Sequence, residues 1–114
     1  MIRVIVESPF KGNTYDDLEI NMRYLRACMH DCLVRGEAPF ASHAIYTQEG
    51  VLDDTDPEER ELGIQAGFAW RTAADKTVVY TDRGVSNGMR YGIKHAEDLG
   101  VTIEYRTLPG WQVP

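Results

Sequence analysis

The segment Asp82-Arg83-Gly84-Val85-Ser86-Asn87-Gly88 has the composition of an anion-binding turn. It lies between an expected strand and an expected helix, so its backbone N–H groups can point at a ligand from the positive end of the helix. A phosphate is the group that such a turn would bind, with Arg83 or Arg90 as a cationic partner. The same residues also have a purely structural interpretation, in which Ser86 caps the helix and the glycines form the turn.

A second group of polar residues follows the first apolar run of the chain. Glu7, Ser8 and Pro9 come after Ile2–Val6, which is rich in β-branched residues and is typical of a buried strand. A serine hydroxyl and free backbone amides at a strand end can bind a sugar or a phosphate, although a proline there is also a simple way to end the strand. Ser8 and Pro9 are therefore candidate ligand contacts.

His43, Tyr46 and a short acidic group are further candidates. The imidazole of His43 can form a hydrogen bond and the ring of Tyr46 can stack on a base, although a lone histidine is more often a packed or surface residue. Asp53 and Asp54 could bind sugar hydroxyls or a cation. Asp56 has a structural explanation, because it precedes a proline and two glutamates, which is the signature of a helix start.

These residues lie between segments whose periodicity alternates between strand and helix. The expected strands cover residues 2–6, 40–46, 77–81 and 101–105, and the expected helices follow N-caps at Thr14, Asp56 and Ser86, the first ending at Gly36 and the third at Gly100. This alternation predicts a parallel sheet of about four strands with helices on both faces. Ligands of such sheets bind beyond the carboxyl ends of the strands, where four segments should meet: residues 7–13, 43–55, 82–88 and 106–108.

Length, charge and cysteine content exclude several classes of protein. The 114 residues, 43% of them hydrophobic, suit a single domain over residues 1–114. A formal net charge of -6 argues against nucleic-acid binding, and no apolar run approaches the ~20 residues of a membrane span. Cys28 and Cys32 are expected to be reduced and structural, and neither a metal nor a cofactor is expected. We expect a cytoplasmic protein.

Four stretches of the chain together resemble a known family. They are Glu7-Ser8-Pro9-Phe10, Ala38-Pro39-Phe40-Ala41-Ser42-His43, Leu52-Asp53-Asp54-Thr55-Asp56-Pro57-Glu58-Glu59-Arg60 and Ser86-Asn87-Gly88-Met89. They span nearly the whole chain and resemble a family of small uncharacterised proteins common in phages and bacteria. That family is similar in turn to the nucleoside 2-deoxyribosyltransferases and the deoxynucleoside 5'-monophosphate N-glycosidases. The resemblance implies a flavodoxin-like (Rossmann-like) α/β three-layer sandwich, an oligomer, and the host cytoplasm for a phage-encoded member.

The resemblance also implies roles for individual residues. In those N-glycosidases the loop after the first strand and a Ser-x-Gly turn, here residues 86–88, bind the sugar and the 5'-phosphate. Their nucleophile is a glutamate about six residues after the serine, and Gly92 stands at that position in this chain. Because glycine cannot replace a carboxylate nucleophile, the same chemistry would need an acid from elsewhere, such as Glu7, Asp54 or Glu97. Glu7 is the candidate catalytic residue.

Two functions are consistent with these residues. In the first, the protein binds a nucleotide or a nucleotide-derived small molecule without covalent chemistry, for example to sequester a signal. In the second, it cleaves or transfers an N-glycosidic bond, with Glu7 beside His43 as the relocated acid. We favour binding because Gly92 has no side chain. A phage-encoded inhibitor of a partner protein would fit the size and acidity, but no residue indicates one.

The helix that follows Asp56 also bears on assembly. It carries an apolar stripe that consists of Leu62, Ala66, Ala69, Trp70 and Ala73. Gly63 and Gly67 beside this stripe allow another backbone to approach closely. Trp70 and the tail residue Trp111 could lie at an interface with a second copy or could cover the protein's own core. We expect a homodimer or a larger homo-oligomer that completes the pocket.

Overall fold

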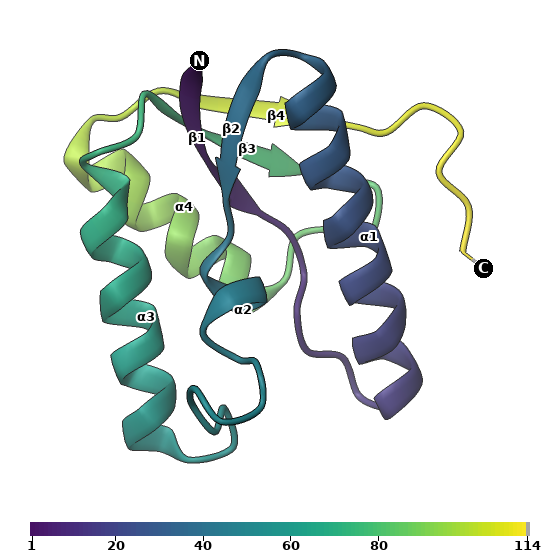
Figure 1. The fold of residues 1–114 in the computed structure, drawn as a ribbon, viewed down its shortest axis with the longest axis vertical. Coiled ribbons are helices and arrows are strands. Elements are labelled where there is room, and N and C mark those ends of the chain that lie inside the picture. Colours follow the sequence, from purple (N-terminus) through teal and green to yellow (C-terminus); the bar gives the residue numbers. More distant parts are fainter. Residues whose placement is uncertain (114) are drawn as a thin grey trace.

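The computed structural model describes residues 1–113 as one sheet with helices on both sides (Figure 1). The strands are β1 (Ile2–Glu7), β2 (Glu37–Phe40), β3 (Lys76–Tyr80) and β4 (Ile103–Arg106). The helices are α1 (Tyr15–Val34), α2 (Ser42–Ile45), α3 (Pro57–Arg71) and α4 (Asn87–Leu99). The predicted α/β alternation is confirmed.

The sheet has the order β2-β1-β3-β4, and every neighbouring pair of strands is parallel. α1 packs on the face that contains Val4 and Val78, whereas α4 packs against Val79 on the opposite face. α3 lies on the same side as α4, because its Arg71 bonds to Thr77, whose side chain shares the face of Val79. The fold is therefore the expected three-layer sandwich. The strand order reverses beside β1, since β2 lies on one side of it and β3 on the other.

Side-chain caps define the starts of three helices, as the sequence predicted. The hydroxyl of Thr14 accepts a hydrogen bond from the backbone N–H of Asp17 at 3.1 Å, and the Asp17 carboxylate accepts one from the N–H of Thr14. Asp56 caps α3 and Ser86 caps α4 through their side-chain oxygens. Gly100 ends α4 with a φ of 70°, a conformation that glycine adopts without strain.

The segment 40–46 does not form the strand that we expected. β2 ends at Phe40, and residues 42–45 form the single helical turn α2. The apolar residues that suggested a strand form an aromatic cluster instead: the ring of Phe40 lies 5.2 Å from that of Trp70 and 6.2 Å from that of Tyr46. The strand prediction was wrong because these rings pack toward α3, while pairing with β1 extends only over residues 37–40 of this segment.

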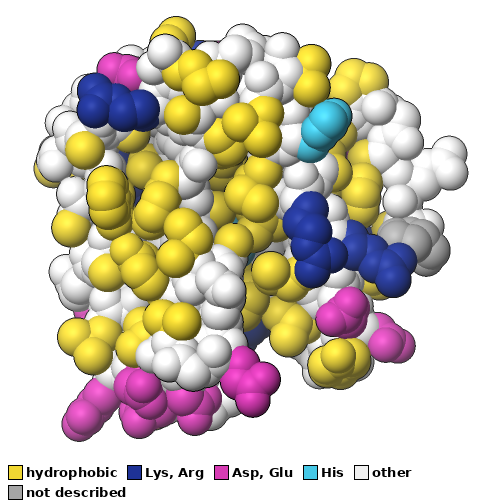
Figure 2. All heavy atoms as spheres, viewed as in Figure 1, with side chains coloured by type: hydrophobic (Ala, Val, Ile, Leu, Met, Phe, Trp, Pro, Cys, Tyr) yellow, Lys and Arg dark blue, Asp and Glu magenta, His cyan; other side chains and the backbone are white. Residues whose placement is uncertain are grey.

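α3 turns its apolar stripe outward. Leu62 is 61% exposed and Trp70 is 50% exposed, whereas the buried residues of this helix are Gly67 and Arg71. The close approach at Gly67 is made within the chain, because a Cβ there would lie 2.8 Å from the Cβ of Ser42 in α2. Figure 2 shows apolar side chains over the face on which α3 lies, and acidic side chains at the end where the helix begins. The two buried residues of α3 are thus a glycine and an arginine, and a cavity remains between this helix and β1.

The C-terminal tail covers the α1 side of the sheet. The ring of Trp111 lies 5.0 Å from that of Tyr24 and packs against the core on this side. Cys28 and Cys32 are free, buried thiols in the same core, as the sequence predicted. Within residues 1–113, no helix is long and apolar enough to cross a membrane.

Candidate functional site

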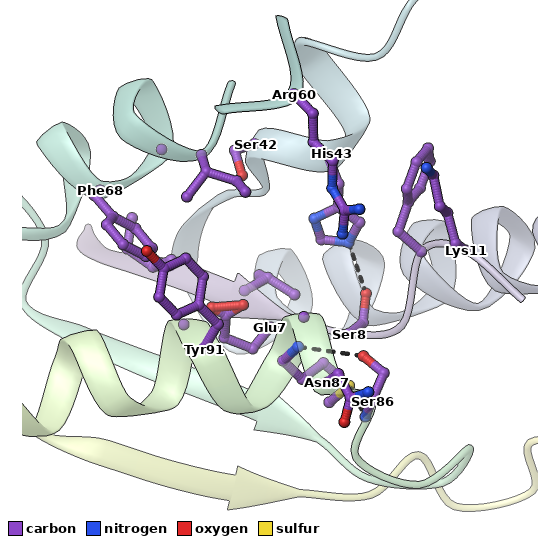
Figure 3. Close-up of a pocket in the computed structure, with 18 of the residues that line it drawn as sticks. Glu7, Ser8, Lys11, Ser42, His43, Arg60, Phe68, Ser86, Asn87 and Tyr91 are labelled. Carbon is purple, nitrogen blue, oxygen red and sulfur yellow. Dashed lines mark hydrogen bonds between the residues drawn. The ribbon is translucent and has the colours of Figure 1, made fainter. Parts of the chain in front are cut away.

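A cavity of about 330 Å³ lies at the carboxyl end of β1 (Figure 3). Its walls come from β1 and the loop that follows, from α2, from α3 and from α4. Strand order reverses here, and ligands of open parallel sheets bind at such points. The cavity brings together most of the residues singled out in the sequence: Glu7, Ser8, Phe10, His43, Asp54, Ser86, Asn87, Gly88 and Met89.

Glu7 is the last residue of β1 and presents its carboxyl group to this cavity (Figure 3). Its Oε2 atom accepts a hydrogen bond from Nη2 of Arg71 at 3.1 Å, and its side chain is 14% exposed. Burial raises the pKa of the Glu7 carboxyl group from 4.5 to about 7, because desolvation outweighs the attraction of the Arg71 guanidinium. Glu7 can therefore hold or release a proton near neutral pH.

Arg71 of α3 fixes the orientation of Glu7. Its Nη1 donates to Oγ1 of Thr77 at 2.7 Å, and its Nε donates to Nδ1 of His95 at 3.0 Å. His95 stacks on Phe68, with the ring centroids 3.8 Å apart and an interplanar angle of 7°. Because all three guanidinium nitrogens are engaged, Arg71 is held in place, and its Nη2 atom anchors one oxygen of the Glu7 carboxyl group.

Gly92 of α4 leaves the space in which the Glu7 carboxyl group lies. A Cβ at Gly92 would be 2.1 Å from Oε2 and 2.6 Å from Cδ of Glu7. Real Cβ atoms do not approach other heavy atoms this closely, so any larger residue at position 92 would displace Glu7. A carboxyl group from β1 thus stands in the space where a side chain from α4 would begin.

Ser8 and His43 form a hydrogen-bonded pair on another wall. The Oγ atom of Ser8 lies 3.0 Å from Nε2 of His43, and the His43 ring makes an edge contact with Phe10. Burial lowers the pKa of His43 to about 4. The imidazole is therefore neutral at pH 7 and is suited to hydrogen bonding with a ligand, not to ion pairing.

Charged and aromatic side chains line the remainder of the cavity. Nζ of Lys11 lies 3.1 Å from Oδ2 of Asp54, so this ion pair joins the loop after β1 to the loop before α3. Arg60 extends from α3 toward the cavity (Figure 3). Phe68 and Tyr91, with ring centroids 5.3 Å apart, provide an aromatic wall between α3 and α4.

The start of α4 forms the floor opposite α2. The Oγ atom of Ser86 accepts a hydrogen bond from the N–H of Met89 at 3.2 Å, so this hydroxyl serves as the helix cap. Asn87 and Gly88 are exposed and line the cavity. Their N–H groups belong to the first turn of the helix, where the backbone has no intrahelical acceptor. Both interpretations of the turn are thus compatible with the geometry.

Several residues singled out in the sequence lie outside the cavity. Asp82 accepts hydrogen bonds from the hydroxyl of Tyr24 at 2.5 Å and from the N–H of Leu108, which ties the tail to α1. Pro9 is buried and Arg90 is exposed, and neither lines the cavity. Nε of Arg83 donates to Asn21, and Tyr46 borders a smaller adjoining cavity of about 70 Å³.

Other residues that line the cavity were not singled out as candidate site residues in the sequence. Lys11, Arg60, Phe68, Arg71 and Tyr91 come from a loop and from helix positions where charged and aromatic residues are common. Arg71 is the exception, because the sequence contains a sign of its role. It lies four residues after Gly67, so the two residues share one face of α3, and an arginine on an inward face, where an apolar residue is expected, indicates a buried charged partner. In the part of the chain that the structure describes, no group of three acidic, histidine or cysteine side chains could hold a metal ion.

Residues 2–106 match the family described as "Domain of unknown function (DUF7768)". The chain belongs to this family. No curated protein matches the sequence. The structure is similar to that of a 2-deoxyribosyltransferase from the psychrotolerant bacterium Bacillus psychrosaccharolyticus, with a TM-score of 0.70 at 14% sequence identity. The alignment covers 98% of this DUF7768 chain and 77% of the transferase chain.

This similarity confirms the fold of the DUF7768 domain. A shared architecture over 98% of the chain bears out the flavodoxin-like α/β fold and the resemblance to deoxyribosyltransferases, which the sequence suggested. At 14% identity it shows the fold alone, so the chemistry of the cavity has to be argued from the residues that line it.

Proposed function

We propose that the cavity beside β1 binds a nucleoside or nucleotide. The observation that carries this proposal is the combination, in one cavity of about 330 Å³, of the Glu7 carboxyl group with the aromatic wall of Phe68 and Tyr91. A sugar offers hydroxyl groups to a carboxyl group and a base offers a flat face to aromatic rings. The fold supports the same ligand class, since its structural neighbour is described as a biocatalyst for nucleoside synthesis.

A variant at the start of α4 tests this binding site. Gly88 faces open space, with Oγ of Ser86 4.0 Å from the position of a Cβ, so Gly88→Leu should fold and fill part of the cavity. We expect thermal stabilisation of the natural chain by at least one of the four deoxynucleosides or their 5'-monophosphates, and none of Gly88→Leu. Glu19→Leu, at an exposed position of α1 on the other side of the sheet, is the matched control and should respond like the natural chain. Equal stabilisation of all three proteins would show that the ligand binds outside this cavity.

Cleavage of an N-glycosidic bond is the second candidate function. The specific observation in its favour is that the Glu7 carboxyl group lies within 3 Å of the position of a Cβ at Gly92, where the resemblance expects the nucleophile. An oxygen of the ionised Glu7 carboxylate would attack the anomeric carbon while the C–N bond breaks, its electron pair going to the base, which takes up a proton from water. Water would then attack the same carbon, release the sugar and restore the carboxylate.

Chromatography separates the two candidates. Under the binding proposal, incubation with deoxynucleoside monophosphates releases no free base above background. If base is released, the rate should fall by at least ~100-fold in Glu7→Gln, because an amide is a poor nucleophile. Base release that is unchanged in Glu7→Gln would exclude Glu7 as the nucleophile.

We also propose that the protein forms a homodimer through α3. The stripe defined by Leu62, Ala66, Ala69, Trp70 and Ala73 is apolar, and all of its residues except the half-buried Ala66 are exposed in the single chain, which supports an interface. Light scattering should give twice the 12.9 kDa mass of one chain. The variant Trp70→Glu should give the mass of one chain, and a single-chain mass for the natural protein would contradict the proposal.

A further inference from the structure

The charges that line the main cavity do not balance. Among its lining residues, Glu7 is paired with Arg71 at 3.1 Å and Asp54 is paired with Lys11 at 3.1 Å. The remaining charged residue of the lining is Arg60. The protein carries a formal net charge of -6, yet this cavity has an excess of one positive charge when Glu7 is ionised and a larger excess when Glu7 is protonated.

The guanidinium group of Arg60 is available to bind an anionic ligand. Within residues 1–113 it forms neither an ion pair nor a side-chain hydrogen bond. Its side chain extends from α3 toward His43, across the cavity from the start of α4 (Figure 3). Because burial lowers the pKa of His43 to about 4, the imidazole is neutral and does not repel the guanidinium.

The positive excess is confined to the main cavity. Two smaller cavities adjoin it at Arg60, but one is also lined by Glu59 and the other by Glu61. A long polyanion that extended from the main cavity would therefore meet carboxylates. One anionic group of limited size, such as a single phosphate, matches the one uncompensated guanidinium, whose planar N–H groups can bind two phosphate oxygens at once.

We propose that Arg60 recognises the phosphate of a nucleoside monophosphate, so that the cavity selects the monophosphate over the uncharged nucleoside. The inference rests on the proposed binding of a nucleoside or nucleotide and adds the charge that this ligand must carry. In this arrangement the sugar and base contact Glu7 and the aromatic wall, and the phosphate lies at the mouth between Arg60 and the start of α4. The sequence offered Arg83 and Arg90 for this role, but neither lines the cavity.

Calorimetric titrations with deoxyadenosine, deoxycytidine, deoxyguanosine and thymidine, each paired with its 5'-monophosphate, test the proposal. We expect the natural chain to prefer one monophosphate over its nucleoside by ~10- to 100-fold, which is the range for a charge-assisted pair. Arg60→Gln should remove most of this preference and Arg60→Lys should restore part of it. Arg26→Gln, which changes an exposed arginine of α1 on the other side of the sheet, should keep the full preference.

The outcomes separate this inference from the proposed function. A preference that persists in Arg60→Gln, or equal binding of nucleoside and monophosphate by the natural chain, would overturn the role of Arg60 while leaving the binding site in place. If no nucleoside or nucleotide binds, the proposed function fails, and inorganic phosphate becomes the probe. Phosphate-induced shifts of the arginine side-chain NMR signals that disappear in Arg60→Gln would support Arg60, and their absence in the natural chain would overturn it.

Discussion

Replacement of Glu7 by glutamine should change how the stability of the protein depends on pH. The pKa of Glu7 is raised from 4.5 to about 7 by folding, so between these values the folded chain holds a proton that the unfolded chain has released. The stability from this group is fully present below pH 4.5 and is lost as the pH rises through about 7. The difference, 7 minus 4.5, corresponds to about 3 kcal/mol.

The substitution removes this dependence with little change in shape. Glutamine still offers an oxygen to Arg71 but does not titrate. The free energy of unfolding should therefore fall by about 3 kcal/mol more in the natural chain than in Glu7→Gln between about pH 4.5 and about pH 8. His43 acts in the opposite direction, because its pKa is lowered from 6.5 to about 4 and its contribution grows as the pH rises between these values. His43 is present in both proteins, so its effect cancels in the difference.

Urea unfolding at a series of pH values measures this difference directly. The linear dependence of the unfolding free energy on urea gives its value at each pH for both proteins. Curves that diverge as the pH rises from about 5 to 8 are the expected result. Parallel curves would refute the assignment of a raised pKa to Glu7, and a larger loss in Glu7→Gln than in the natural chain would refute its sign.

Three further perturbations address the cavity and the core. Gly92→Ala should lower the unfolding free energy measured by chemical denaturation by about 1–3 kcal/mol, because the added Cβ collides with Glu7. Gly88→Ala, where the added Cβ meets open space, should change it little, and equal effects of the two variants would contradict the close approach at Gly92. Arg106→Met should cost about 3 kcal/mol in the same assay, since it strips buried Glu37 of two hydrogen bonds at 2.7 and 2.6 Å; no loss would contradict the burial of this pair. The ring signals of His43 should stay constant between about pH 5 and 8 in NMR spectra, because burial lowers its pKa to about 4; a midpoint near 6.5 would contradict that burial.

The parts of the fold that local rules determine could be predicted from the sequence. Helix starts at Thr14, Asp56 and Ser86 depend on hydrogen bonds within three residues, and these are visible in the chain. Runs of β-branched residues likewise identified β1 and β3. Because parallel strands place their carboxyl ends at one edge of the sheet, three of the four loops expected at the cavity followed from the order of the elements. The fourth prediction was wrong, because residues 106–108 do not line the cavity and Leu108 packs on the α1 side of the sheet.

The parts that depend on long-range packing could not be predicted in this way. Phe40 and Tyr46 suggested a strand because they are apolar residues in an extended segment. That the ring of Phe40 packs against those of Trp70 and Tyr46 depends on the position of α3, which no local rule reveals. The pairing of Arg71 with Glu7 joins residues 64 positions apart, so the sequence does not show it. The net charge of the cavity depends on such pairs, because they decide which basic side chain remains without an acidic partner. Position 92 is a further example. The sequence shows that Gly92 has no side chain, but it does not show that the carboxyl group of Glu7 from β1 occupies the space beside it.

An NMR titration of the isotopically labelled protein with the four deoxynucleoside 5'-monophosphates tests the proposed binding site most directly. We expect saturable shifts at Glu7, Phe68 and Gly92 with at least one of the four ligands, and no change at Tyr24 on the α1 side of the sheet. Spectra that remain unchanged with all four ligands at millimolar concentration, or shifts confined to the α1 side, would contradict the account.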